Sequence, residues 1–219
     1  MIIVAIDETN FKKASNIIDQ LDSSKCMIKI GSVAFNSIGH NVIDYGAQQG
    51  FDIFLDLKLH DIPNTCISTI KAIKDLKVNY LTIHISSGLE ALKAAKKVSG
   101  KIKLIGVTVL TSLDNKALRE IGFNKNVKKI VLHQAKLANK AKLDAIVCSA
   151  QEVKIVRKIF KKEIITPGIR FTSKINDQKR VLTPKEAYAN GADWLVIGRD
   201  LTKGNIKKNT QSLIDHLSQ

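Results

Sequence analysis

Short apolar runs rich in isoleucine and valine recur along the whole chain, and each has the length of one buried β-strand. Between most of them lie longer stretches in which apolar residues return with the periodicity of a helix. The runs cover residues 2–6, 27–30, 53–57, 80–83, 104–109, 145–147, 164–166 and 194–197. The helical stretches cover residues 11–21, 33–49, 64–76, 89–98, 126–139 and 152–160.

Strands that alternate with helices indicate parallel βαβ units. Eight such strands in a chain of 219 residues predict an α/β fold of one kind, a closed (β/α)8 barrel or TIM barrel. An open doubly wound sheet is disfavoured, because its first strand is normally followed by a glycine-rich turn. The first run is followed instead by Asp7-Glu8-Thr9.

Two prolines mark helix starts that fit this pattern. Thr183-Pro184-Lys185-Glu186 combines an N-cap threonine, a proline at the first helical position and a capping-box glutamate. Pro63 suits the first turn of a helix that begins just after Asp61.

The chain shows no break in composition. No proline-rich or glycine/serine-rich stretch marks a linker, so we expect a single domain over residues 1–219. The first apolar run is cut off by Asp7, which leaves it too short for a secretory signal or a membrane span. The three cysteines lie far apart and form no C-x-x-C pair, as expected for reduced thiols. We therefore expect a cytoplasmic protein that does not enter a membrane.

The formal net charge of +15 could indicate a nucleic-acid partner. The lysines argue against one, because they recur at helical spacing along the whole chain, as at Lys71 and Lys74 or Lys154 and Lys158. Arginine is scarce, and the aromatic residues that could stack on bases make up only 5% of the chain. We predict a solvated lysine coat and no nucleic-acid partner, with a surplus of charge that favours an anionic substrate.

The active site of a (β/α)8 barrel lies at the carboxyl ends of the strands and in the loops that follow. Polar residues at the ends of the apolar runs are therefore candidates for a site. They are Asp7, Lys29, Asp56, Lys58, His84, Thr108, Thr111, the turn Pro167-Gly168-Ile169-Arg170, Gly198 and Arg199. The histidines are not at ligand spacing, so we assign them structural or surface roles and leave His84 out of the site.

The densest of these clusters spans residues 54–65. Because strand side chains alternate, Asp56 and Lys58 project to the same side as Phe54. An acid and a base on an apolar strand are costly to bury unless they pair or have a task, so an ion pair that only fixes the barrel rim is one alternative. Carboxylates on both sides of Lys58 would keep it protonated, as a proton donor must be.

The motif Asp56-Leu57-Lys58-Leu59-His60-Asp61, continued by Ile62-Pro63-Asn64-Thr65, closely resembles the signature of the orotidine 5′-phosphate decarboxylases. Further blocks resemble the same family in order from the first strand to the last, so the resemblance covers essentially the whole chain. They are Lys29-Ile30-Gly31, residues 107–112, residues 166–170, residues 177–180 and Ile197-Gly198-Arg199. The resemblance implies decarboxylation of orotidine 5′-phosphate to uridine 5′-phosphate, the last step of pyrimidine nucleotide synthesis, with no cofactor and no metal.

The resemblance also implies roles for individual residues. Lys29, Asp56, Lys58 and Asp61 resemble an alternating charged array in which Lys58 protonates C6 as CO2 leaves. Asp61 and Thr65 would reach into the site of a neighbouring subunit, so a homodimer is expected. The matching substrate contacts are Asp7 and Thr65 at the ribose, Thr111 beside the pyrimidine, and Arg170, Gln178, Gly198 and Arg199 around the phosphate.

The chemistry of these residues suits those roles. Backbone N–H groups at Gly198 and beyond would meet the phosphate at the start of the last helix, and Arg199 adds a bidentate donor. The polar segment 171–180 has no clear strand or helix, as a closing lid would. Phe171 departs from the family, which commonly has proline there, and this changes the stiffness expected of the lid.

Two other functions stay open. Mg²⁺-dependent decarboxylases and synthases of ketose phosphates, on a related barrel, share Asp-x-Lys-x-x-Asp but typically carry a metal-binding glutamate at the end of the second strand. Lys29 stands there in this chain and would repel a cation. The alternative of another class is a basic nucleic-acid-binding barrel protein, since a fold alone does not fix function. Salt-dependent binding to random DNA without activity on the nucleotide would favour it.

Overall fold

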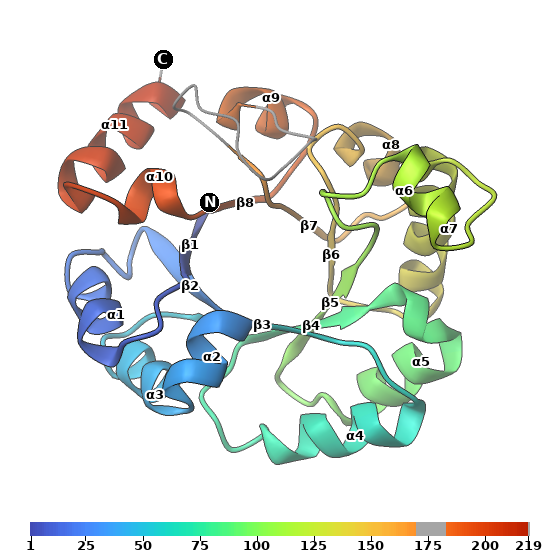
Figure 1. The fold of residues 1–219 in the computed structure, drawn as a ribbon, viewed down its shortest axis with the longest axis horizontal. Helices are drawn as coiled ribbons and strands as arrows, with labels where there is room; N and C mark the ends of the chain where they lie inside the picture. The colour runs from blue at the N-terminus through green and yellow to red at the C-terminus, as the bar shows by residue number, and fades with distance from the viewer. Residues whose placement is uncertain (170–182, 219) are drawn as a thin grey trace.

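The computed structural model describes residues 1–169 and 183–218, and within them eight parallel strands close into a barrel in chain order (Figure 1). Strand β8 pairs with β1 and so completes the ring. The strands are β1 (Ile2–Ile6), β2 (Cys26–Gly31), β3 (Ile53–Leu59), β4 (Tyr80–His84), β5 (Lys103–Val107), β6 (Ala145–Val147), β7 (Glu163–Thr166) and β8 (Trp194–Ile197). The (β/α)8 barrel predicted from the sequence is confirmed.

Helices surround the barrel and connect successive strands (Figure 1). They are α1 (Phe11–Ile18), α2 (Ser32–Ile38), α3 (Asn41–Gln48), α4 (Pro63–Ala72), the 3-10 helix η1 (Ile85–Ser87), α5 (Gly88–Val98), α6 (Asn115–Glu120), α7 (Val127–Lys140), α8 (Val153–Arg157), α9 (Pro184–Ala189), α10 (Arg199–Thr202) and α11 (Ile206–Ser218). In the described part of the chain, no helix is both long and apolar enough to cross a membrane.

The two helix starts marked by proline are confirmed. Pro63 is the first residue of α4 and Pro184 the first of α9. Thr183 caps α9, because its hydroxyl accepts the backbone N–H of Glu186 while the Glu186 side chain accepts the backbone N–H of Thr183.

The single helix predicted over residues 33–49 is wrong, because this segment forms two helices. Gly39 follows the last residue of α2 with a φ of 74°, a conformation that side chains with a Cβ rarely adopt. Its N–H still bonds to the carbonyl of Phe35, and the chain then turns into α3. The apolar periodicity continues through the break, so only the glycine could have indicated it.

Apolar residues form two layers, one inside the barrel and one between the barrel and the helices. The inner layer takes one or more residues from each strand, and the outer layer takes the residues that alternate with them. The inner layer contains Ile3, Met27, Phe54, Tyr80, Ile105, Ala145 and Ile165, with Val147, Trp194 and Val196 packed against it. This filled interior leaves space for a site only at an end of the barrel.

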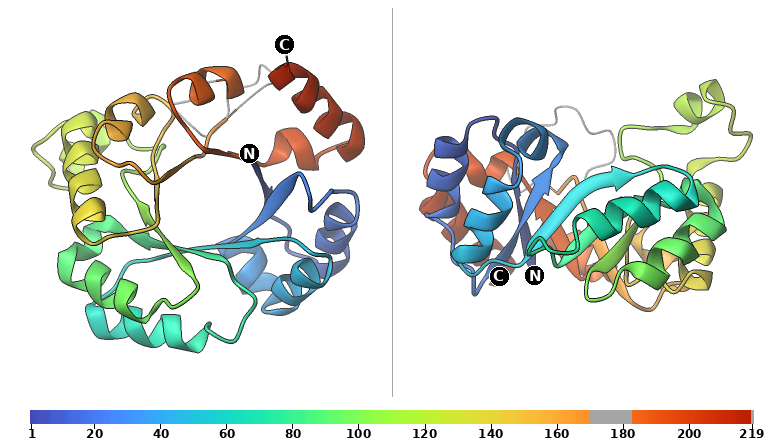
Figure 2. Two further views of the ribbon diagram at one scale, coloured as in Figure 1. Left: turned by 180° about the vertical axis from the view of Figure 1, so that it is seen from behind. Right: turned by 90° about the horizontal axis from the view of Figure 1, so that it is seen from below.

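The two ends of the barrel differ. The side view places the N-terminus, at the start of β1, at one end and α6 at the opposite end (Figure 2). The strands are parallel, so their carboxyl ends all face the end that carries α6.

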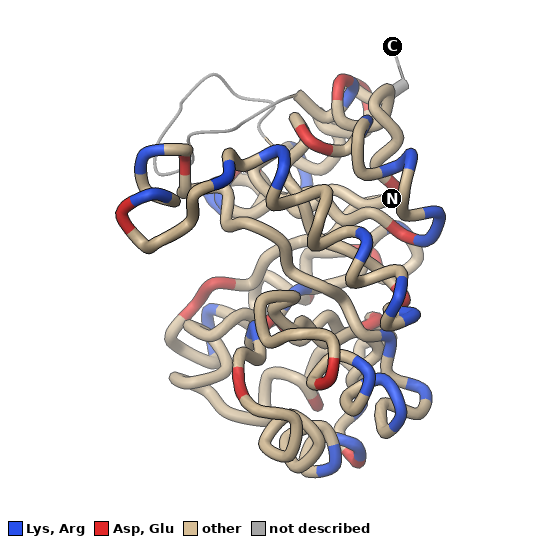
Figure 3. Tube along the Cα trace, turned by 90° about the vertical axis from the view of Figure 1, so that its right-hand side faces the viewer, with Lys and Arg blue, Asp and Glu red and all other residues tan. Residues whose placement is uncertain are grey.

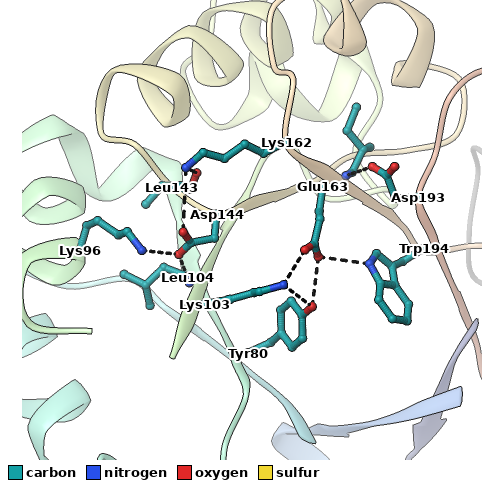
Figure 4. Close-up of polar contacts among 11 residues, drawn as sticks. Tyr80, Lys96, Lys103, Leu104, Leu143, Asp144, Lys162, Glu163, Asp193 and Trp194 are labelled. Atoms are coloured by element: carbon teal, nitrogen blue, oxygen red, sulfur yellow. Dashed lines mark hydrogen bonds and ion pairs between the residues drawn. The ribbon is translucent and has the colours of Figure 1, made fainter. Parts of the chain in front are cut away.

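A polar network closes the other end, where the strands begin. Glu163, the first residue of β7, accepts hydrogen bonds from Lys103 Nζ at 2.6 Å, Trp194 Nε1 at 3.1 Å and the Tyr80 hydroxyl at 3.2 Å (Figure 4). Burial raises the pKa of Tyr80, so its hydroxyl stays protonated and can donate. One carboxylate therefore links the starts of β4, β5, β7 and β8.

We expect Glu163→Ala to lower the free energy of unfolding by about 2 kcal/mol, because it leaves the donors of Tyr80 and Trp194 without their acceptor. Urea unfolding followed by the emission of Trp194, the one tryptophan of the chain, measures this. Glu120→Ala is the control, since Glu120 forms an exposed pair with Lys116 at 3.9 Å and its loss should change stability by less than about 0.5 kcal/mol. Equal stabilities for the two variants would contradict the assigned role of Glu163.

Candidate active site

A cavity of about 290 Å³ lies at the carboxyl ends of the strands. It has a charged side and an apolar side, and it brings together several of the residues predicted for the site. Those that line it are Asp7, Lys29, Asp56, Lys58, Thr111, Gly198 and Arg199. Phe54 lines the same cavity, so the three residues predicted to share one side of β3 do so.

Four of these side chains form an alternating chain of charges. Lys29 Nζ lies 3.5 Å from Asp7 Oδ1 and 3.5 Å from Asp56 Oδ2. Lys58 Nζ lies 2.9 Å from the same Asp56 oxygen. The side chains of Lys29 and Asp56 are nearly buried, whereas that of Lys58 is 40% exposed. The ammonium group of Lys58 is therefore accessible from the cavity, and its ion pair with the nearly buried Asp56 holds it there.

Asp56 is ionised in this environment. Burial alone would raise its pKa, but the ammonium groups of Lys29 and Lys58 and the hydroxyl of Thr82 together hold the pKa below its usual value of 3.8. A lowered folded-state pKa stabilises the fold fully above that usual value. The contribution is lost as the pH falls through the lowered value, so Asp56 stays charged at neutral pH.

The backbone at Lys58 has an uncommon conformation. Its φ is 53°, in the left-handed region that only Lys142 shares among the non-glycine residues that the structure describes. The pairing of β3 with β4 also shifts here, because Leu55 pairs with Leu81 but Leu59 pairs with Ile83. Such local strain is typical of functional sites, and the residue that carries it here lines the cavity.

Gly31, two residues after Lys29 on β2, leaves room for the charged chain. A Cβ at this position would lie 3.0 Å from Lys29 Nζ and 3.4 Å from Asp7 Oδ1. A larger residue would therefore press on the ammonium group that joins the two carboxylates.

Gly198 and Arg199, which follow β8, line the cavity next to Asp7. A Cβ at Gly198 would lie 3.9 Å from Asp7 Oδ2, so glycine keeps the space beside Asp7 open. The helix that follows is α10, which has four residues, and it is not the last helix of the chain. The expectation of a phosphate at the start of the last helix is wrong in this detail, and a helix of one turn contributes only a small dipole.

Asp61 and Thr65 do not join the other site residues within this chain. Both are exposed, and neither lines the cavity. Asp61 Oδ1 accepts the N–H of Ile62 at 2.7 Å, in the loop that leads into α4. Arg170, Gln178, Phe171 and the lid predicted at 171–180 lie outside the described residues.

His84, the last residue of β4, stays outside the candidate site. Its ring lies 5.1 Å from the ring of His60, and His84 does not line the cavity. Burial lowers the pKa of His84, and the charges of His60 and Lys58 lower it further, so the ring is neutral at neutral pH. Within the described residues, no group of three or more His, Cys, Asp and Glu side chains is arranged to hold a metal ion.

The sequence analysis missed the apolar wall of the cavity and one buried threonine. The wall consists of Ala5, Val107, Val109, Leu110, Val147, Cys148, Ile169 and Val196. Apolar side chains beside a charged chain suit a ligand that has both an apolar part and an anionic group. The threonine is Thr82, whose hydroxyl lies 3.1 Å from Asp56 Oδ1. Its signal in the sequence was a polar residue inside the apolar run at 80–83.

Comparison with known proteins agrees with this geometry. The model of the orotidine 5′-phosphate decarboxylase / HUMPS family matches residues 1–211. The chain is 45% identical over 217 residues to the orotidine 5′-phosphate decarboxylase of Wolbachia sp. subsp. Brugia malayi, an alignment that covers 97% of this chain and 96% of that protein. It is 44% identical over 210 residues to that of Mannheimia succiniciproducens, with 92% and 90% covered. The crystal structure of orotidine 5′-phosphate decarboxylase from Lactobacillus acidophilus matches with a TM-score of 0.87 at 32% identity, and the match covers 100% of this chain and 99% of that one.

Proposed function

The chain belongs to the orotidine 5′-phosphate decarboxylase / HUMPS family, and we propose that it converts orotidine 5′-phosphate to uridine 5′-phosphate and CO2, the last step of pyrimidine nucleotide synthesis. The observation that carries the proposal is the pair of ammonium groups on Lys29 and Lys58, which lie on either side of Asp56 at 3.5 and 2.9 Å. A metal-dependent relative would need an anionic ligand where Lys29 stands. The charged chain suits a reaction that creates negative charge on carbon.

Lys58 supplies the proton in this proposal. The C6–carboxylate bond of the substrate breaks, CO2 leaves, and the electron pair stays on C6. Lys58 stabilises the developing charge and then transfers a proton from Nζ to C6, which leaves a neutral amine that regains a proton from water. Asp56 holds the ammonium group of Lys58 in place through the 2.9 Å ion pair and repels the carboxylate of the bound substrate.

Residues other than Lys58 and Asp56 bind the ribose and the phosphate of the nucleotide. Asp7 binds the ribose hydroxyls, Thr111 lies beside the pyrimidine, and Gly198 and Arg199 bind the phosphate together with Arg170 and Gln178. Arg199 suits this role because a guanidinium group offers two parallel donors to a phosphate. Binding energy from the phosphate can then be used to hold the base against the charged chain.

We also propose a homodimer in which Asp61 and Thr65 complete the site of the partner. Their exposure and their absence from the cavity of their own chain support this arrangement. Ile62, between them, is an apolar side chain that is 66% exposed, as a residue of an interface would be in an isolated chain. One domain over residues 1–219 and a cytoplasmic location belong to the same proposal.

A nucleic-acid partner is the less favoured alternative. Lysine and arginine positions are spread over many elements in Figure 3, with acidic residues among them, and do not form one continuous stripe in that view. A footprint for DNA would gather the positive charge on one face.

The proposal is tested by following the ultraviolet absorbance of orotidine 5′-phosphate mixed with the purified protein in EDTA. We expect the absorbance of the substrate to disappear at the same rate with and without EDTA, because no step uses a metal. If the protein is inert in EDTA but acts on ketose phosphates after Mg²⁺ is added, the proposed reaction is wrong.

A further inference from the structure

Strand β3 does not continue regularly through the site. Between the pairs Leu55–Leu81 and Leu59–Ile83, β3 advances four residues while β4 advances two. The additional residues include Asp56 and Lys58, so neither has a regular partner on β4. A backbone that leaves the ladder in this way needs another acceptor for its N–H groups.

Thr82 of β4 provides that acceptor. The backbone N–H of Lys58 donates to the Thr82 hydroxyl oxygen at 2.8 Å. The same hydroxyl donates its proton to Asp56 Oδ1 at 3.1 Å. Thr82 is fully buried, on the same face of β4 as Tyr80 of the inner layer.

The directions of these two bonds follow from the groups involved. A backbone N–H can only donate, so the hydroxyl oxygen must accept from Lys58. An ionised carboxylate can only accept, so the single hydroxyl proton goes to Asp56. The two bonds use the hydroxyl as acceptor and as donor at once. They connect the backbone of the proton donor with the carboxylate that orients its ammonium group.

On the premise of the proposed function, we propose that Thr82 is a positioning residue for the decarboxylation. Its hydroxyl fixes the left-handed backbone at Lys58, where φ is 53°, and holds one oxygen of Asp56. The second carboxylate oxygen is then directed at both ammonium groups, 2.9 Å from Lys58 Nζ and 3.5 Å from Lys29 Nζ. Thr82 does not line the cavity, so it acts on the substrate only through these two residues.

The threonine side chain suits this task better than serine. Branching at Cβ restricts the side-chain rotamer, so the hydroxyl is held in one direction. Valine keeps the branched shape but has no oxygen. Alanine and serine differ from each other by the hydroxyl oxygen alone, which makes them a matched pair.

The test compares Thr82→Val, Thr82→Ala and Thr82→Ser with the wild type in steady-state kinetics on orotidine 5′-phosphate. We expect kcat to fall by about 10- to 100-fold in the valine and alanine variants, because the geometry of the proton donor is loosened. Serine should restore kcat to within about fivefold of the wild type. The KM and the Kd for uridine 5′-phosphate, measured by calorimetry, should change by less than about threefold, since the groups that bind the nucleotide are untouched.

Several results would overturn the inference. A valine variant with at least half of the wild-type kcat would do so, as would a serine variant as impaired as the alanine variant. A loss that appears only in KM would assign Thr82 to binding. If the valine variant does not fold, the alanine–serine pair decides in the same way. An inactive wild type would instead refute the proposed function, so the two failures can be distinguished.

Discussion

Lys58→Ala is expected to lower kcat for orotidine 5′-phosphate by about 10⁴-fold or more, the combined loss of a proton donor and of a positive charge beside the reacting carbon. That loss corresponds to about 5 kcal/mol of transition-state stabilisation. Lys58 Nζ is one of two ammonium groups within 3.5 Å of Asp56, and it is the more exposed of the two. Lys29, with a nearly buried side chain between two carboxylates, is not placed to replace it.

Further variants are needed to distinguish the two roles of Lys58, which are to donate a proton and to supply a positive charge. Lys58→Arg keeps a positive charge, but a guanidinium group does not release its proton in proteins, so we expect it to stay at least about 100-fold below the wild type. Lys71→Ala, at an exposed lysine of α4, is the matched surface control and should keep wild-type kcat. Binding of uridine 5′-phosphate should survive in all three variants, because Lys58 is not among the groups proposed to bind the phosphate. An alanine variant with a tenth of the wild-type kcat would exclude Lys58 as the proton donor.

The sequence was sufficient for the barrel because each strand carries its own signal. Apolar runs such as 2–6 and 194–197 coincide with β1 and β8, and the intervals between runs leave room for a helix. Polar residues at the ends of those runs could then be expected to lie close together, because the carboxyl ends of the parallel strands all face one end of the barrel. Asp7, Lys29, Asp56 and Arg199 were predicted in this way and line one cavity.

The irregularity of β3 could not be predicted in the same way. The apolar pattern of a strand does not give its register with the neighbouring strand, and β3 gains residues relative to β4 where its charged residues lie. The left-handed backbone of Lys58 has no sequence signal, since glycine or asparagine would be the usual residue there. Thr82 was missed for a related reason, because its role depends on which atoms of β3 come to lie opposite it.

The role predicted for Asp61 cannot be assessed from a single chain. Asp61 is exposed, and among the contacts that the described residues show its carboxylate accepts only the backbone N–H of Ile62, while its carbonyl accepts the thiol of Cys66. None of these contacts accounts for a role in catalysis. A role for Asp61 in the charged array therefore depends on a second copy of the chain. This dependence can be tested without a structure of the dimer. If each site contains residues of both chains, two different inactive variants can form a mixed dimer in which one site has all of its residues.

Mixing Lys58→Ala with Asp61→Ala chains is expected to restore activity that neither variant has alone. In a mixed dimer, the intact Lys58 of one chain meets the intact Asp61 of the other, so one of the two sites is complete. Random exchange makes half of the dimers mixed, so the mixture should reach about a quarter of the wild-type rate. We expect each variant alone to stay below about 1% of the wild type, because each lacks one charged group of every site. The measurement is the decarboxylation rate before and after the two proteins are unfolded together and refolded.

The control is the mixture of Lys58→Ala with Asp56→Ala. Both residues lie on β3 of the same chain and contact each other at 2.9 Å, so no mixed dimer of these variants contains a complete site. If Asp61 acted within its own chain, its mixture with Lys58→Ala would stay as inactive as this control. Restored activity in the first mixture alone would place Asp61 in the partner's site and make the dimer the smallest active form. This result would also explain why Asp61 is exposed in the isolated chain, because a carboxylate that reaches into the partner's cavity cannot line the cavity of its own chain.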